Sequence, residues 1–241
     1  MKIMEKFAQK QRELANHSGV SLAFLGDSVT QGCFETYRRA ADELRTCYEQ
    51  ENGYHHQLAR MLATLYPLVP VNLINAGICG DGSDHGLERL ERDVLRWNPD
   101  MAVVCFGLND SLKGMEGLED YLLSMRGIFA KLHEAGIETV FMTPNMMCTY
   151  VDYTITDDLL LAAAEKCTII QREGILEQYL EAAKALCKEY DVRVCDCYAK
   201  WKTLYQNGVE VTDLLAGKIN HPTREMHMLF AVSLLETMMT E

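Results

Sequence analysis

Residues 24–32 of the chain are FLGDSVTQG. The apolar run at residues 21–25 predicts a buried strand, and this strand stops abruptly at Gly26. Gly26 permits a tight turn, so Ser28 lies just past a strand end, where ligands bind in open α/β sheets. Two interpretations of Ser28 follow. It is a nucleophile if a base reaches it, or else Asp27 or Ser28 simply caps the next helix.

Four more apolar runs predict strands, and helical patterns separate them. The strands are expected at residues 71–75, 101–107, 137–143 and 192–196, and the helices at 54–66, 87–97, 118–135, 158–190 with a break around Gly174, 197–206 and 223–238, where Thr223 is a plausible N-cap. This alternation is typical of a parallel sheet covered by helices on both faces, with right-handed crossovers. We expect residues 1–241 to form one domain that begins with a helix or arm over residues 1–18.

One polar stretch, residues 33–53, does not fit the alternation. It carries three arginines and many acidic residues, and it is too long for an ordinary loop of an α/β fold. Its place directly after Ser28 predicts an insertion near the site. The pattern leaves two forms open, a helical insertion and a mobile lid.

The composition is typical of an acidic, soluble globular protein, with 48% hydrophobic residues and a net charge of −12. Such a charge argues against nucleic acid and against an anionic membrane surface as partners. The N-terminus lacks the apolar core of a signal peptide, and no segment approaches the roughly 18 apolar residues of a membrane span. We therefore expect a cytoplasmic protein. Its nine scattered cysteines indicate reduced, mostly buried thiols, and no Cys or His spacing supports a metal site.

The ends of the first three strands carry polar or glycine-rich turns, and parallel strands end at the same edge of a sheet. These turns contain Ser28, Gly80 and Asn109, and a late loop contains His221. Acyl transfer needs a nucleophile, a base and donors aimed at the developing oxyanion. In this arrangement Ser28 attacks, and His221 accepts its proton and returns it to the leaving alcohol. The backbone N–H groups of Ser28 and Gly80, with the side-chain amide of Asn109, form the oxyanion hole.

In these residues the chain resembles the SGNH/GDSL hydrolases, a family of GDSL-like lipases, acylhydrolases and esterases. Gly26-Asp27-Ser28 matches the first block of the family, and NAGICGDGS (75–83) resembles the second, with Gly80 as the oxyanion glycine. GLND (107–110) resembles the third block, and His221-Pro222 the last. The blocks occur in the family's order over residues 21 to about 231. The resemblance implies a three-layer α/β/α sandwich with a flavodoxin-like, five-stranded parallel sheet in the order 2-1-3-4-5, and ester hydrolysis without a cofactor or metal.

The chain departs from the family at Lys218, because an aspartate usually stands three residues before the catalytic histidine. A lysine cannot accept the imidazole N–H, and its charge disfavours the imidazolium. A backbone carbonyl then orients His221 in a Ser-His dyad, or another acid does so. Asp213 and Asp196 are the candidates for that acid, although Asp196 also fits a role in fixing its own loop. The sequence assigns no acid.

These features favour a serine esterase that hydrolyses short acyl esters, foremost acetyl esters, with acylated sugars among the candidate substrates. The expected partner is a small-molecule ester, and the sequence leaves homo-oligomer formation open. A lysophospholipase or thioesterase of the same family is one alternative, and a catalytically silent carbohydrate-binding domain is another. A nucleotide-binding protein is disfavoured, since the chain has neither the Gly-Lys-Ser/Thr of a P-loop nor a GxGxxG spacing at these turns.

Overall fold

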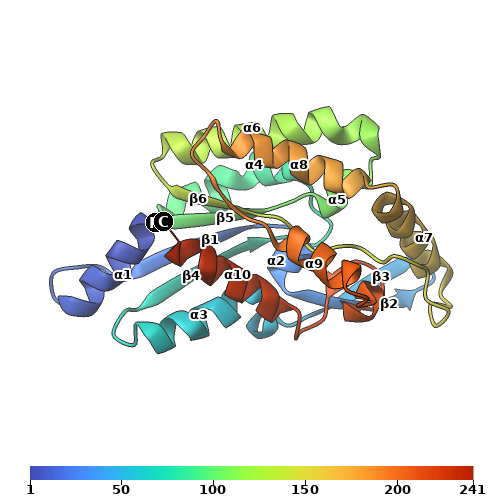
Figure 1. Cartoon of the computed structure of the whole chain (residues 1–241), viewed down its shortest axis with the longest axis horizontal. Helices are drawn as coiled ribbons and strands as arrows, with labels where there is room; N and C mark the ends of the chain where they lie inside the picture. Colours follow the sequence, from blue (N-terminus) through green and yellow to red (C-terminus); the bar gives the residue numbers. More distant parts are fainter. Residues whose placement is uncertain (241) are drawn as a thin grey trace.

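The computed structural model describes residues 1–240, and within them five strands form one parallel sheet (Figure 1). The strands are β1 (Val20–Gly26), β4 (Val71–Gly77), β5 (Met101–Cys105), β6 (Glu138–Met142) and β7 (Arg193–Cys195). They lie in the order β4-β1-β5-β6-β7, and every neighbouring pair is parallel. Numbered along the chain, this is the predicted order 2-1-3-4-5, which is confirmed.

Helices cover both faces of the sheet, as the alternating pattern predicts (Figure 1). The helices α4, α6 and α8 lie over one face, and α1, α3 and α10 lie over the other. The bounds are α1 (Lys2–Arg12), α2 (Ser28–Gln31), α3 (Tyr54–Leu65), α4 (Ser83–Asp93), α5 (Leu108–Ser111), α6 (Leu118–Glu134), α7 (Asp158–Arg172), α8 (Ile175–Cys187), α9 (Cys197–Gln206) and α10 (His227–Met239). The expected break at Gly174 separates α7 from α8, and Gly174 has a φ of 69° there. Thr223 does not cap the last helix, which begins four residues later.

The polar stretch 33–53 does not form a helical insertion, one of the two forms that its pattern left open. It contains an antiparallel hairpin of β2 (Cys33–Ala40) and β3 (Glu43–Tyr48), followed by a short 3₁₀ helix at Gln50–Asn52. Ion pairs hold the hairpin at both ends. At its base Arg224 binds the carboxylates of Glu35 and Glu49, and towards its tip Arg38 binds Asp157 at the start of α7. A polar two-stranded ribbon has little apolar periodicity, so the sequence did not reveal its strands.

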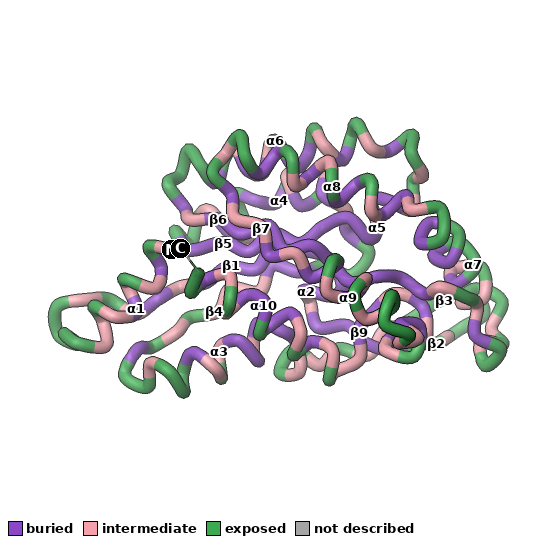
Figure 2. The backbone as a smooth tube through the Cα atoms, in the orientation of Figure 1, coloured by how far each residue is buried: buried purple, intermediate pink, exposed green. Residues whose placement is uncertain are grey.

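The apolar side chains form one connected core on the two faces of the sheet. All five residues of β5 are buried, as expected for a central parallel strand (Figure 2). The nine cysteines form no disulfide within residues 1–240, and all except Cys47 and Cys79 are buried. No helix in this described part of the chain has both the length and the apolar character needed to cross a membrane.

A buried arginine, Arg89 of α4, ties the carboxyl ends of two neighbouring strands together. Its guanidinium donates to the carbonyl of Gly26 at the end of β1 (2.9 Å) and to that of Ala76 near the end of β4 (2.6 Å). The same group donates to the carboxylate of Asp81 at 2.7 Å. These three acceptors are buried or nearly so, and an unpaired buried acceptor is costly. Arg89 therefore fixes the loops that leave the sheet at this edge.

We predict that Arg89→Lys destabilises the fold, because an ammonium cannot reach three acceptors in the planar arrangement that a guanidinium serves. The free energy of unfolding, measured by urea denaturation, should fall by about 2–4 kcal/mol. Arg92→Lys is the matched control, since Arg92 lies on the same helix and pairs with Asp93 at the exposed surface. It should change the stability by only about 0–1 kcal/mol. Equal losses in the two variants would contradict this role of Arg89.

Candidate active site

Ser28 is the first residue of α2 and follows the end of β1 directly. The capping role belongs to Asp27, whose carboxylate accepts the N–H of Val29 at 2.9 Å. Ser28 is only 3% exposed, and its Oγ lies 2.8 Å from Nε2 of His221, a residue 193 positions later in the chain. The structure thus brings together the predicted nucleophile and the predicted base.

The second ring nitrogen of His221, Nδ1, makes the contact that determines the orientation and tautomer of the imidazole. Nδ1 lies 2.7 Å from the main-chain carbonyl of Phe34, at the base of the hairpin. A carbonyl oxygen accepts hydrogen bonds and never donates them, so Nδ1 carries the proton in the neutral ring. Nε2 is then unprotonated and accepts the hydroxyl proton of Ser28. This is the tautomer that a general base needs.

Burial controls the charge of His221. The residue is 6% exposed. Burial lowers the pKa of His221 below its ordinary value of 6.5, and the hydrogen bond to the Phe34 carbonyl and the negative charge of Glu35 act in the opposite direction. Because Glu35 is also paired with Arg224, much of its field is neutralised. The imidazole is therefore neutral near pH 7 and able to accept a proton.

Lys218, which stands where the family usually has an aspartate, takes no part in this contact. It adopts a left-handed backbone conformation with a φ of 60°, and its ammonium binds Asp213 at 2.6 Å at the surface. Asp213 is thereby occupied. Asp196 accepts hydrogen bonds from Thr143 and from the backbone N–H of Ala199, and it also pairs with a lysine, which fits a role in fixing its loop. Of the alternatives that the sequence left open, only the backbone carbonyl contacts His221.

Of the other two predicted residues, Gly80 lies in the turn after β4, and Asn109 lies in the short helix α5 after β5. The Asn109 amide donates to the carbonyl of Asp81 at 2.8 Å, next to Gly80. Within residues 1–240, the N–H groups of Ser28 and Gly80 donate to no other protein atom, and Asn109 keeps a second amide hydrogen. Gly80 has a φ of 81°, which favours glycine, whereas an added Cβ would meet nothing within 4 Å. The backbone conformation at this position therefore favours glycine.

Two further residues form hydrogen bonds that position the segments of the site, and the sequence analysis did not identify them. Gln31, at the end of α2, accepts the N–H of Cys79 through its side-chain oxygen at 2.6 Å, which steadies the turn before Gly80. Asn145, after β6, donates to the carbonyl of Asn220 at 2.8 Å, directly before His221. The only available signal was position, because both are amides just beyond strand ends at this edge of the sheet. Neither has a spacing that marks it as a support for a distant loop.

The buried histidines near the dyad carry no charge. Burial lowers the pKa of His55 and of His227 to about 3, and the charge of neighbouring histidines lowers each pKa further. His227 begins α10, and its Nδ1 accepts the N–H of Tyr54. His227 is thus held by a contact within the core, and it does not compete with His221 for the proton of Ser28.

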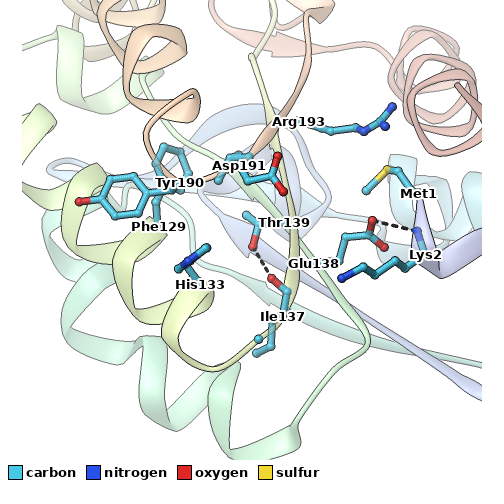
Figure 3. Close-up of a pocket in the computed structure, with 12 residues that line it drawn as sticks. Met1, Lys2, Phe129, His133, Ile137, Glu138, Thr139, Tyr190, Asp191 and Arg193 are labelled. Carbon is cyan, nitrogen blue, oxygen red and sulfur yellow. Dashed lines mark hydrogen bonds between the residues drawn. The ribbon is translucent and has the colours of Figure 1, made fainter. Parts of the chain in front are cut away.

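A separate pocket lies at the opposite edge of the sheet, near the amino ends of β6 and β7 (Figure 3). It has a volume of about 380 Å³, and its lining includes Lys2, His133, Glu138 and Arg193. Glu138 already accepts the backbone N–H groups of Lys2 and Ile3. The strands are parallel, so this pocket is a sheet length away from Ser28. Among residues 1–240, no group of three or more His, Cys, Asp or Glu side chains is placed to hold a metal ion.

Comparison with known proteins relates the chain to one family of esterases and acylhydrolases. Residues 24–229 match the model of the GDSL-like Lipase/Acylhydrolase family. An acetylxylan esterase of Geobacillus stearothermophilus is 24% identical over 232 residues, which cover 90% of this chain and 93% of that protein. The crystal structure of Axe2, an acetylxylan esterase from the same organism, aligns with this chain with a TM-score of 0.67 at 23% identity. The alignment covers 93% of this chain and 96% of that one.

A second solved structure agrees in fold. LAE5, an alpha/beta hydrolase enzyme from the metagenome of Lake Arreo in Spain, has a TM-score of 0.67 at 17% identity and covers 91% of this chain and 95% of its own. The family match spans most of the chain, from the residues of β1 to those of α10. The protein therefore belongs to the GDSL-like Lipase/Acylhydrolase family and is a carboxylic ester hydrolase.

Proposed function

We propose that the protein is a serine esterase that hydrolyses short acyl esters of carbohydrates, foremost acetyl esters, through an acyl-enzyme on Ser28. The observation that carries this proposal is the hydrogen-bonded chain from Ser28 Oγ through His221 to the Phe34 carbonyl. It joins a nucleophile to a neutral base of the correct tautomer. The similarity to an acetylxylan esterase supports an acetylated carbohydrate as the substrate class.

In the proposed first step, Ser28 Oγ attacks the ester carbonyl while Nε2 of His221 takes the hydroxyl proton. The charge that develops on the carbonyl oxygen is held by the N–H groups of Ser28 and Gly80 and by the amide of Asn109. The imidazolium then gives its proton to the leaving alcohol. In the second step a water molecule replaces the alcohol, attacks the acyl-enzyme with help from the same base, and releases the acid and Ser28.

The imidazolium forms here without a carboxylate partner. Solved structures of the Geobacillus stearothermophilus enzyme include catalytic mutants in which alanine replaces a serine, an aspartate or a histidine three residues after that aspartate. In this chain Lys218 occupies the corresponding spacing before His221. The Phe34 carbonyl takes over the orienting role, and its dipole together with Glu35 supplies the negative potential near the ring. A Ser-His dyad is therefore the mechanism that these contacts support.

Covalent labelling tests the nucleophile. We expect Ser28→Ala to abolish both the hydrolysis of p-nitrophenyl acetate and labelling by a fluorophosphonate, because no other hydroxyl contacts His221 Nε2. The fold should survive, as judged by circular dichroism and melting temperature. Ser18→Ala, at an exposed site, is the control and should keep full labelling. Labelling of wild type at a different serine would reject the assignment, and a wild-type protein that is neither labelled nor active would favour the silent carbohydrate-binding domain.

The oxyanion hole predicts a change mainly in kcat. Asn109→Ala removes one donor to the transition state, and the loss of such a donor typically lowers kcat by a factor on the order of 10²–10³. KM should change little, because the donor acts on charge that is absent from the bound ester. Steady-state kinetics with p-nitrophenyl acetate measures both constants. A change in KM alone would mean that Asn109 binds the substrate uniformly.

The contacts of His221 and Lys218 predict the pH profile. The pKa of His221 is lowered, so the neutral base persists below pH 6.5, and kcat/KM should be lost only as the pH falls through a value lower than 6.5. Lys218→Ala should leave kcat/KM within about twofold, since its ion pair with Asp213 is at the surface. His221→Ala should lose several orders of magnitude. Measurements of kcat/KM from pH 5 to 9 on the three proteins check this. A large loss in Lys218→Ala with an active His221→Ala would indicate a lysine base.

A further inference from the structure

Two cysteines from distant segments, Cys33 and Cys79, come together beside the candidate active site. Cys33 begins β2, and Cys79 lies in the turn after β4. The side-chain oxygen of Gln31 contacts both residues, since it lies 3.8 Å from Cys33 Sγ and accepts the N–H of Cys79 at 2.6 Å. Cys79 Sγ lies 3.9 Å from Oγ1 of Thr46. Thr46 shares a face of the ribbon with Tyr48, the strand partner of Cys33, so Cys79 lies over the face that carries Cys33.

The two thiols differ in their access to solvent. Of the nine cysteines, all of which lie in the described part of the chain, only Cys79 is exposed, whereas Cys33 is 0% exposed. A second pair, Cys195 and Cys197, has its sulfur atoms 3.7 Å apart, but both residues are buried. An oxidant that arrives from solvent therefore meets Cys79 and is kept from the second pair.

The surroundings of Cys79 favour its reactive form. Hydrogen bonding from the Cys33 thiol is the main cause that lowers the pKa of Cys79, burial acts in the opposite direction, and the hydroxyl groups of Thr46 and Tyr48 lower the pKa further. The balance holds the pKa of Cys79 below its ordinary value of 9.0. The thiolate is the form of cysteine that attacks oxidants, and an exposed thiolate beside a second cysteine is the usual arrangement of an oxidation-sensitive pair.

We propose that Cys79 and Cys33 form an oxidation site, at which a hydroperoxide produces a disulfide that lowers the activity of the enzyme. The Cys79 sulfur attacks the O–O bond of the hydroperoxide and becomes a sulfenic acid, and the second oxygen leaves as an alcohol or as water. The Cys33 sulfur then attacks the Cys79 sulfur, the S–S bond forms, and the hydroxyl group leaves as water with the proton of Cys33. The two thiols lose two electrons, which the hydroperoxide gains.

The order of these steps follows from the interaction between the two sulfur atoms. In the reduced pair, hydrogen bonding to Cys79 is the main cause that raises the pKa of Cys33, and burial raises it further. A sulfenic acid at Cys79 is neutral, so the charge that kept Cys33 protonated is removed by the first oxidation. Cys33 therefore acts second, as the resolving thiol, and needs no contact with solvent.

The disulfide would connect two segments that the candidate site needs in fixed positions. Cys79 directly precedes Gly80, whose N–H is a proposed donor to the oxyanion. Cys33 directly precedes Phe34, whose carbonyl orients His221. Bonded sulfur atoms lie closer together than sulfur atoms in contact, so the turn and the hairpin must move towards each other. A misplacement of about 1 Å can lower a rate by a factor on the order of 10². This effect on activity rests on the proposed function, whereas the thiol chemistry does not.

Mass spectrometry tests the oxidation site. Reduced wild type is treated with hydrogen peroxide at pH 7, blocked with iodoacetamide and digested without a reductant. We expect one linked pair of peptides, which contains Cys33 and Cys79. Cys33→Ser should instead accumulate a sulfenic acid at Cys79 that dimedone labels, and Cys79→Ser should give neither product. Cys47→Ser is the matched control, because Cys47 lies on the opposite face of the ribbon, and it should behave like wild type.

Steady-state kinetics with p-nitrophenyl acetate tests the effect on activity. The kcat/KM of wild type and of Cys47→Ser should fall at least tenfold after peroxide treatment and recover with dithiothreitol. Cys79→Ser should keep the kcat/KM that it had before treatment, which separates the disulfide from oxidation elsewhere in the protein. Melting temperatures show whether the variants fold, and Cys33→Ala takes the place of Cys33→Ser if the buried position does not accept serine.

Three results would overturn the inference. Oxidation of Cys79 in wild type without a link to Cys33 would mean that Cys33 does not resolve the sulfenic acid. A link to any other cysteine would place the site elsewhere. A disulfide between the two residues that leaves kcat/KM unchanged would remove its effect on the candidate site. A protein that is inactive on every ester would reject the proposed function and the loss of activity with it, and the linked peptides would still decide whether the oxidation site exists.

Discussion

The hydrogen bond between His221 Nδ1 and the carbonyl of Phe34 is the contact on which the candidate site depends. It determines the tautomer of the imidazole and aims Nε2 at Ser28, which a free ring would do only part of the time. A main-chain carbonyl can do this only if the backbone that carries it is immobile. The hairpin supplies that backbone, and Arg224 holds it through Glu35 and Glu49 while stacking over the ring of Phe34. The hairpin therefore supports the proposed base.

The charges around the dyad are consistent with this arrangement. A carboxylate in contact with His221 would raise its pKa and stabilise the imidazolium, and within residues 1–240 no carboxylate is hydrogen-bonded to the ring. The neutral ring is instead favoured by burial, and the positive charge of Lys218 is directed to Asp213 at the surface. The carbonyl orients the base, but as a neutral acceptor it stabilises the imidazolium less than a carboxylate would. Glu35 contributes part of the missing negative potential at a longer range.

Hydrogen bonds between neighbouring strand ends hold the side of the candidate site that carries the proposed oxyanion hole. The order β4-β1-β5 places the turns after these three strands next to one another. Arg89 joins the first two, and the Asn109 amide reaches from the third to Asp81. Donors that are fixed before the substrate binds need no reorganisation when charge develops, which is the main physical requirement for an oxyanion hole. These hydrogen bonds fix the proposed donors in place, which suits this edge to acyl transfer.

The sequence by itself determined the five strands of the parallel sheet, the helices that alternate with them and the pair Ser28 and His221 at its edge, because apolar periodicity is local and parallel strands all end at one edge. It did not reveal the hairpin, since a solvated ribbon such as that containing Arg38 and Arg45 lacks this periodicity. It also left open which group orients His221, and it missed Arg89 and Gln31. Only the tertiary structure decided these points. The carbonyl of Phe34 lies 187 residues from His221 in the chain, and a backbone carbonyl is the same in every residue type, so no pattern of side chains distinguishes it.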